Sequence, residues 1–84
     1  MPRYYRHLQQ GDQLIHDSDG IELADLEAAR ADALENIRDI LAEAIRRGND
    51  VPLDDAIVIT DEAGQELMIV PFIEALPPRL RRVV

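Results

Sequence analysis

One long amphipathic segment, residues 26–47, constrains the fold of this chain more than any other feature. At 100° per residue, its apolar side chains fall in an arc of about 160°, the width of a stripe that packs on a sheet; they are Leu26, Ala29, Ala33, Leu34, Ile37, Ile40, Leu41, Ala44 and Ile45. Asp25 is placed to cap the start of a helix, and Gly48 is placed to end it. Because the chain has 84 residues, one such helix on one sheet is about the limit of what it can bury.

Two short extended segments precede this helix. Residues 3–8 alternate in character, and residues 13–16 resume an extended pattern after a turn at Gly11 and Asp12. As a hairpin, these segments carry one set of side chains on each face, with Tyr4, Arg6, Leu8 and Ile15 on one and Tyr5, His7, Leu14 and His16 on the other. Residues 17–20, Asp-Ser-Asp-Gly, then end the second strand with turn-forming residues.

A second hairpin follows the helix. Residues 56–60 and 65–70 are β-rich runs joined by a four-residue turn that ends in Gly64. Pairing across this turn makes both faces apolar, with Ile57, Ile59, Met68 and Val70 on one face and Val58, Leu67 and Ile69 on the other. The sequence therefore predicts an α+β fold of order β-β-α-β-β, an antiparallel sheet with one long helix packed on one face. We expect residues 1–76 to form a single α+β domain and residues 77–84 to form a basic C-terminal tail.

The second apolar face of the predicted sheet needs a cover, because one helix covers only one face. It is exposed, covered by residues 72–80, or buried against a second copy of the chain. Large exposed apolar patches are uncommon in monomers, so we expect a homodimer formed through the sheet. The candidate interface residues are Tyr5, His7, Val58, Leu67 and Ile69.

The chain is acidic, with a formal net charge of −8. Arg79, Arg81 and Arg82 lie in the tail, so residues 1–76 hold six Arg against all seventeen acids, a formal charge of −11. Such a body repels phosphate, and we expect no nucleic-acid binding by the folded part. The tail alone could reach an anion, although a solvated terminus is the preferred interpretation.

Residues suited to chemistry are scarce. The chain has no Cys and no Lys, and Ser18 and Thr60 are its only aliphatic hydroxyl side chains. His7 and His16, with Asp17 and Asp19 nearby, could hold a divalent cation, but their spacing is not diagnostic and ordinary surface residues are the preferred interpretation. We therefore expect no enzyme activity and no cofactor, and we assign no catalytic, cofactor-binding or metal-binding residue.

The sequence carries no sign of export or membrane insertion. No apolar region follows the first residues, and no apolar run approaches the roughly 18 residues that a membrane span needs. The absence of Cys fits a reducing compartment. We expect a cytoplasmic protein with no membrane partner.

Three separated segments resemble, in order, a family of short bacterial proteins of unknown function. The first is the opening Met-Pro-Arg-Tyr-Tyr-Arg-His-Leu of residues 1–8, the second is residues 20–30, and the third is residues 59–64 followed by Val70, Pro71 and Phe72. The resemblance spans nearly the whole chain and implies no activity. The family often carries an aromatic residue where this chain has Arg6.

A looser resemblance links residues 21–48 to the HicB-like antitoxin fold, in which a short β-region precedes an Asp- or Thr-capped helix of this type. HicB-like proteins commonly add a DNA-binding segment, for which this chain offers only the basic tail. Two functions follow as hypotheses. The first is a non-catalytic interaction or regulatory domain acting as a homodimer, and the alternative is a HicB-like antitoxin that neutralises a basic toxin or nuclease.

Overall fold

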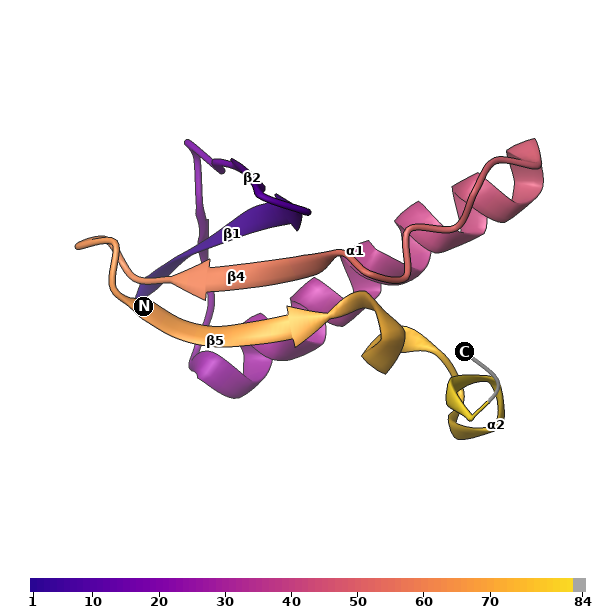
Figure 1. Ribbon diagram of the computed structural model, residues 1–84. Coiled ribbons are helices and arrows are strands. Elements are labelled where there is room, and N and C mark those ends of the chain that lie inside the picture. The colour runs from indigo at the N-terminus through magenta and orange to yellow at the C-terminus, as the bar shows by residue number, and fades with distance from the viewer. Residues whose placement is uncertain (83–84) are drawn as a thin grey trace.

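A computed structural model of the chain describes residues 1–82 and shows one long helix lying across one face of a sheet (Figure 1). In chain order, the elements are β1 (Arg3–Gln10), β2 (Gln13–Ile15), β3 (Ile21–Glu22), α1 (Leu26–Arg47), β4 (Ala56–Thr60), β5 (Glu66–Pro71), the 3-10 turn η1 (Phe72–Ala75) and α2 (Pro78–Arg81). The predicted α+β class is confirmed. The last two residues of the predicted tail, Val83 and Val84, lie outside the described residues.

The sheet is antiparallel, with β1 in its interior. Its strand order is β2-β1-β4-β5, and β3 also pairs with β1. Leu8 lies opposite Ile15, and Ile57 lies opposite Val70, which confirms the predicted faces of both hairpins. The sequence did not predict β3, because a strand of two residues is too short to show a periodicity.

Both predicted ends of α1 are confirmed. Asp25 has an extended backbone, and its carboxylate accepts the backbone N–H of Ala28 over 2.8 Å. Gly48 adopts the left-handed conformation, with φ of 71°, which costs a residue without a Cβ little. Its N–H donates to the carbonyl of Ile45, and the N–H of Asn49 donates to that of Ala44. These bonds satisfy carbonyls that the last turn leaves free.

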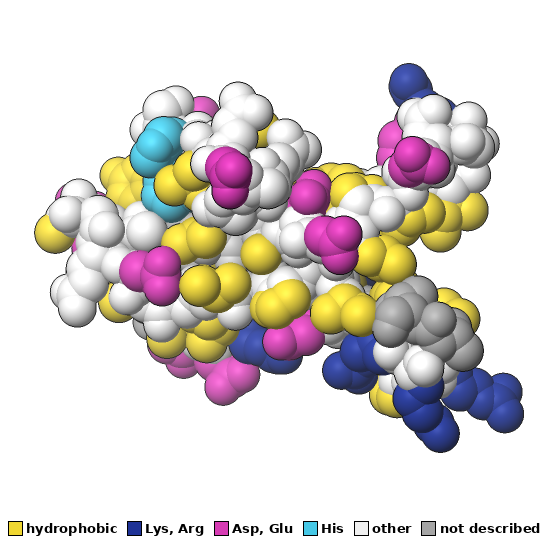
Figure 2. Space-filling view, in the orientation of Figure 1, with side chains coloured by type: hydrophobic (Ala, Val, Ile, Leu, Met, Phe, Trp, Pro, Cys, Tyr) yellow, Lys and Arg dark blue, Asp and Glu magenta, His cyan; other side chains and the backbone are white. Residues whose placement is uncertain are grey.

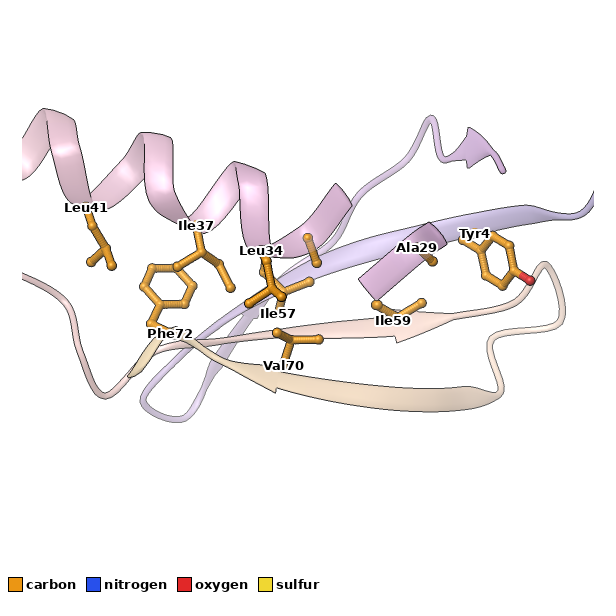
Figure 3. Close-up of a cluster of buried hydrophobic side chains, with 10 residues drawn as sticks. Tyr4, Ala29, Leu34, Ile37, Leu41, Ile57, Ile59, Val70 and Phe72 are labelled. Carbon is orange, nitrogen blue, oxygen red and sulfur yellow. The ribbon is translucent and has the colours of Figure 1, made fainter. Parts of the chain in front are cut away.

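The core fills the space between α1 and the sheet, as Figure 3 shows. Its buried members come from β1, α1, β4, β5 and η1, and they are Tyr4, Ala29, Ala33, Leu34, Ile37, Leu41, Ile57, Ile59, Val70 and Phe72. Phe72 follows β5 and is fully buried next to α1. An ion pair of 3.1 Å between Arg30 and Glu74 also joins α1 to η1. The segment after β5 therefore packs on the α1 side of the sheet.

The C-terminal half of α1 projects past the ends of the strands (Figure 1). A helix of 22 residues is about 33 Å long, whereas a strand of five residues spans only about 17 Å. Ile45 lies on the projecting part and is 65% exposed. The expectation that the whole apolar stripe faces the sheet is therefore wrong for this residue. None of the helices within residues 1–82 combines the length and the apolar character needed to cross a membrane.

Candidate functional site

Alternate residues of β1, β4 and β5 form the face of the sheet that is turned away from α1, here called the open face. His7 lies opposite Val58, and Val58 lies opposite Ile69. Tyr5 lies two positions before His7 on β1. Leu67 lies two positions before Ile69 on β5, beside a bulge. The structure therefore brings the five predicted interface residues together on neighbouring strands.

The five residues differ in exposure. His7 and Val58 are buried and Tyr5 is half-buried, whereas Leu67 is 37% exposed and Ile69 is 51% exposed. Val58 lies on β4, which has a strand on each side, whereas β5 lies at the edge of the sheet. Figure 2 shows hydrophobic side chains in a row over β4 and β5. The apolar surface of the open face is thus concentrated on its edge strand.

The middle of the open face is uncharged. Its central side chains on β1, β4 and β5 are those of Tyr5, His7, Gln9, Ala56, Val58, Thr60, Leu67 and Ile69, whereas the charged residues Arg3 and Glu66 lie at the ends of their strands. Figure 2 shows acidic side chains around this region. Glu66 lies opposite Thr60, at one end of β5. In a chain with a net charge of −8, this face can meet an identical face with little like-charge repulsion.

Hydrogen bonds fix the tautomer of His7. The backbone N–H of Asp17 donates to Nδ1 of His7 over 3.0 Å, so the ring proton belongs on Nε2. Nε2 lies 3.0 Å from Oγ1 of Thr60 and donates to it. The ring of Tyr5 stacks on the imidazole, and the ring of His16 meets it at an angle with centroids 5.1 Å apart.

This arrangement suits a structural histidine. Burial lowers the pKa of His7 below its ordinary value of 6.5, and His16 lowers it further, while the charge of Asp17 acts in the opposite direction. A general base needs a lone pair directed at the hydroxyl, but Nε2 presents a proton to Thr60. Both ring nitrogens are engaged, and no three His, Asp or Glu side chains of residues 1–82 are grouped so that they could hold a metal ion.

Asp17 fills a gap along β1 between β2 and β3. Its carboxylate accepts the backbone N–H groups of Arg6, Asp19 and Gly20 over 3.1, 3.1 and 3.3 Å. Burial raises the pKa of Asp17, but these three donors and the charge of Arg6 outweigh that effect and hold the pKa below its ordinary value of 3.8. The Asp-Ser-Asp-Gly sequence predicts the turn but gives no sign that its first carboxylate replaces a strand.

Arg6 lies on the α1 side of β1, as the alternation predicts. One of its terminal nitrogens, Nη1, donates to the Asp32 carboxylate over 2.6 Å, while within residues 1–82 its buried Nε has no hydrogen-bond partner. A hollow of about 300 Å³ opens here between the first hairpin and α1, lined by Arg6, Leu8, Ile15, His16, Asp17, Asn36, Ile40 and Ile57. Sequence reasoning missed this hollow, because it depends on how α1 crosses the sheet.

A second hollow, of about 260 Å³, lies at one end of the open face. Its lining combines side chains of the first hairpin with the β4–β5 turn, namely Tyr5, His7, Leu14, His16, Thr60, Asp61, Glu62 and Gly64. The sequence predicts that Tyr5, His7, Leu14 and His16 share a face. It does not predict that the second turn lies beside them, because that depends on the pairing of β1 with β4.

Comparison with known proteins gives one match. The model of the family described as a domain of unknown function, DUF6894, matches residues 3–73. The match covers every strand and all of α1 and ends within η1. No curated protein and no solved structure matches the chain. The chain therefore belongs to the DUF6894 family of domains of unknown function.

Proposed function

We propose that this protein is a non-catalytic interaction domain that acts as a homodimer and associates through its sheet. The observation that carries the proposal is the uncharged open face, with Leu67 and Ile69 exposed on β5. Single exposed apolar side chains are normal on protein surfaces. Here two exposed apolar side chains, Leu67 and Ile69, lie two positions apart on β5 and next to apolar residues of β4. Continuous apolar patches of this kind mark interaction sites.

The charge distribution favours a second copy as the partner. A two-fold interface places the same surface on both sides, so any charge at its centre meets its own copy. The central residues of the open face carry none, whereas exposed acids lie elsewhere, such as Glu35 and Asp39 on α1. A basic partner would gain nothing from the uncharged face and would bind the acidic surfaces instead.

The non-catalytic part of the proposal rests on the hydroxyl groups. Thr60 is buried and accepts a hydrogen bond from His7, so it has no base directed at it. Ser18 lies in an exposed bend between β2 and β3. The chain offers no Cys or Lys as another nucleophile.

The alternative function, a HicB-like antitoxin that neutralises a basic toxin or nuclease, stays a prediction. Its support is electrostatic, because a body of this charge attracts basic proteins at low ionic strength. Exposed carboxylates lie along α1 and at its N-terminal cap; they are those of Asp25, Glu27, Glu35 and Asp39. Such a partner would contact these acids and leave the open face unused.

Sedimentation equilibrium of the full chain tests the proposal. We expect a mass of twice 9.5 kDa at micromolar concentration. We expect Leu67→Glu to shift the equilibrium toward the monomer, because each copy then brings a charge to an apolar interface. Ile45→Glu is the matched control, since it adds the same charge to an exposed Ile of the projecting part of α1. A wild-type protein that is monomeric across the whole concentration range would refute self-association. If Ile45→Glu dissociates the dimer and Leu67→Glu does not, the interface lies on α1 and not on the sheet.

A further inference from the structure

The two edges of the sheet differ in how many of their backbone groups are already hydrogen-bonded. Along the outer edge of β1, the short strands β2 and β3 pair with its two ends, and the Asp17 carboxylate accepts the Arg6 N–H between them. This edge therefore offers little free backbone to another chain. Short strands and side-chain acceptors of this kind are among the devices that keep sheet edges from pairing.

The opposite edge, β5, is interrupted only near its two ends. It has six residues, and Leu67–Val70 carry no charge and no proline. Pro71 comes only at its end, and the bulge lies at its start, opposite Ile59 and Thr60. Natural sheet edges are blunted by charged side chains, proline, bulges or short strands. The stretch Leu67–Val70 has no charge and no proline, so its free backbone groups are a template for another strand.

The hydrogen-bond pattern identifies which backbone groups are free. The N–H of Phe72 donates to the carbonyl of Asp55 over 2.9 Å, and antiparallel pairs alternate between bonded and non-bonded. Counting back along β5, Val70 and Met68 bond to β4, while Ile69 directs its N–H and C=O away from the sheet. Pro71 falls on an outward position, where its missing N–H removes no bond to β4.

We propose that two copies of the chain join by antiparallel pairing of their β5 edges, centred on Ile69, so that two sheets become one. This inference rests on the proposed homodimer and places its contact along the β5 edge of the sheet, not over the open face. Ile69 of each copy exchanges both backbone hydrogen bonds with Ile69 of the other. Met68 then lies opposite Val70, and Leu67 lies opposite Pro71, the last residue of β5, so no like charges meet. A second copy fits this edge because the uncharged run is complementary to itself.

Ile69→Pro is the sharpest test, because it removes an outward N–H and leaves the bonds of Met68 and Val70 to β4 intact. We expect it to weaken self-association by about 10- to 100-fold, since each copy loses the central hydrogen bond. Ile69→Val keeps the N–H and should dimerise like the wild type. Circular dichroism of the variants confirms that they fold.

Amide hydrogen exchange on the unmodified chain provides a second measurement that needs no substitution. We expect the Ile69 amide to become protected as protein concentration rises, because it is bonded only in the dimer. Leu14→Glu serves as the comparison, since it charges the open face far from β5. Edge pairing is refuted if the wild type is dimeric and Ile69→Pro does not weaken the dimer. If Leu14→Glu then dissociates the dimer, the two copies associate face to face. If the wild type is monomeric, the proposed function itself fails.

Discussion

The backbone N–H of Asp17 donates to Nδ1 of His7 over 3.0 Å, while the Asp17 carboxylate accepts the N–H of the preceding residue, Arg6. One residue thus binds β1 through both its main chain and its side chain. The first of these bonds needs a lone pair on Nδ1, so a proton on that nitrogen removes it. The attachment of the Asp17 turn to β1 is therefore linked to the protonation of His7.

This link predicts a pH dependence of stability. The pKa of His7 is lowered in the folded protein and returns to its ordinary value of 6.5 in the unfolded chain. Between these two values the unfolded chain binds the proton more strongly, so the free energy of unfolding falls as pH falls below 6.5 and levels off below the lowered value. Urea unfolding between about pH 5 and about pH 8 measures the effect. His7→Gln should remove this slope. His16→Gln should keep the larger part of it, because burial is the main cause of the lowered pKa of His7 and His16 is the second. Equal slopes in wild type and His7→Gln would contradict the assignment.

Asp17→Ala should destabilise the protein by about 1–3 kcal/mol, because it leaves three backbone donors without their acceptor. Urea unfolding at neutral pH gives the change in the free energy of unfolding, and faster exchange of the Arg6 amide would show that β1 is the strand affected. Asp12→Ala is the control, since Asp12 is exposed in the β1–β2 turn and should change stability by less than about 0.5 kcal/mol. An equal effect of both variants would contradict a structural role for Asp17.

Gly20→Ala should cost more stability than Gly11→Ala. Both glycines have positive φ, 69° and 59°, so both alanines carry a backbone penalty of about 1–2 kcal/mol. A Cβ at Gly20 would also lie 2.9 Å from Cε2 of Tyr5 and 3.1 Å from the carbonyl oxygen of Tyr4, whereas a Cβ at Gly11 meets nothing within 4 Å. Thermal unfolding of the two variants measures the difference. Similar melting temperatures would show that Tyr4 and Tyr5 can shift to accept the added Cβ without a loss of stability.

Ile37→Ala should destabilise the protein by about 2–5 kcal/mol, because Ile37 is fully buried between α1 and the sheet. Ile45→Ala makes the same change on the same helix at an exposed position, and we expect less than about 0.5 kcal/mol. Denaturant unfolding at a protein concentration below the dimer range compares them. A large loss for Ile45→Ala under these conditions would mean that the projecting part of α1 packs on the rest of the chain.

The helix and the second hairpin were accessible from the sequence because their signals are local. The predicted helix of residues 26–47 agrees with α1 at both ends, where Asp25 and Gly48 act through neighbouring backbone groups. The strand predicted over residues 65–70 is shifted by one residue from β5, because the turn and the bulge occupy the intervening positions.

The details of the candidate site depend on contacts between distant residues. His7 and Thr60 are separated by 53 positions, and no local pattern predicts that β1 pairs with β4. Because β4 occupies one edge of β1, Asp17 covers the other edge. The same pairing leaves β5 at the edge of the sheet. The alternation of residues 65–70 places Ile69 on the correct face, but its exposure follows from the strand order, which hydrophobicity alone does not encode.

The interior position of β1 also determines when this domain can fold. During synthesis, β1 obtains its long partner only after Thr60 has been added to the chain, since β4 pairs with Tyr5–Gln9. Until then, α1 has no Ile57, Ile59 or Val70 on which to pack its apolar stripe. Sheet and helix must therefore be completed together, in one late step, and such dependence on distant strands slows folding.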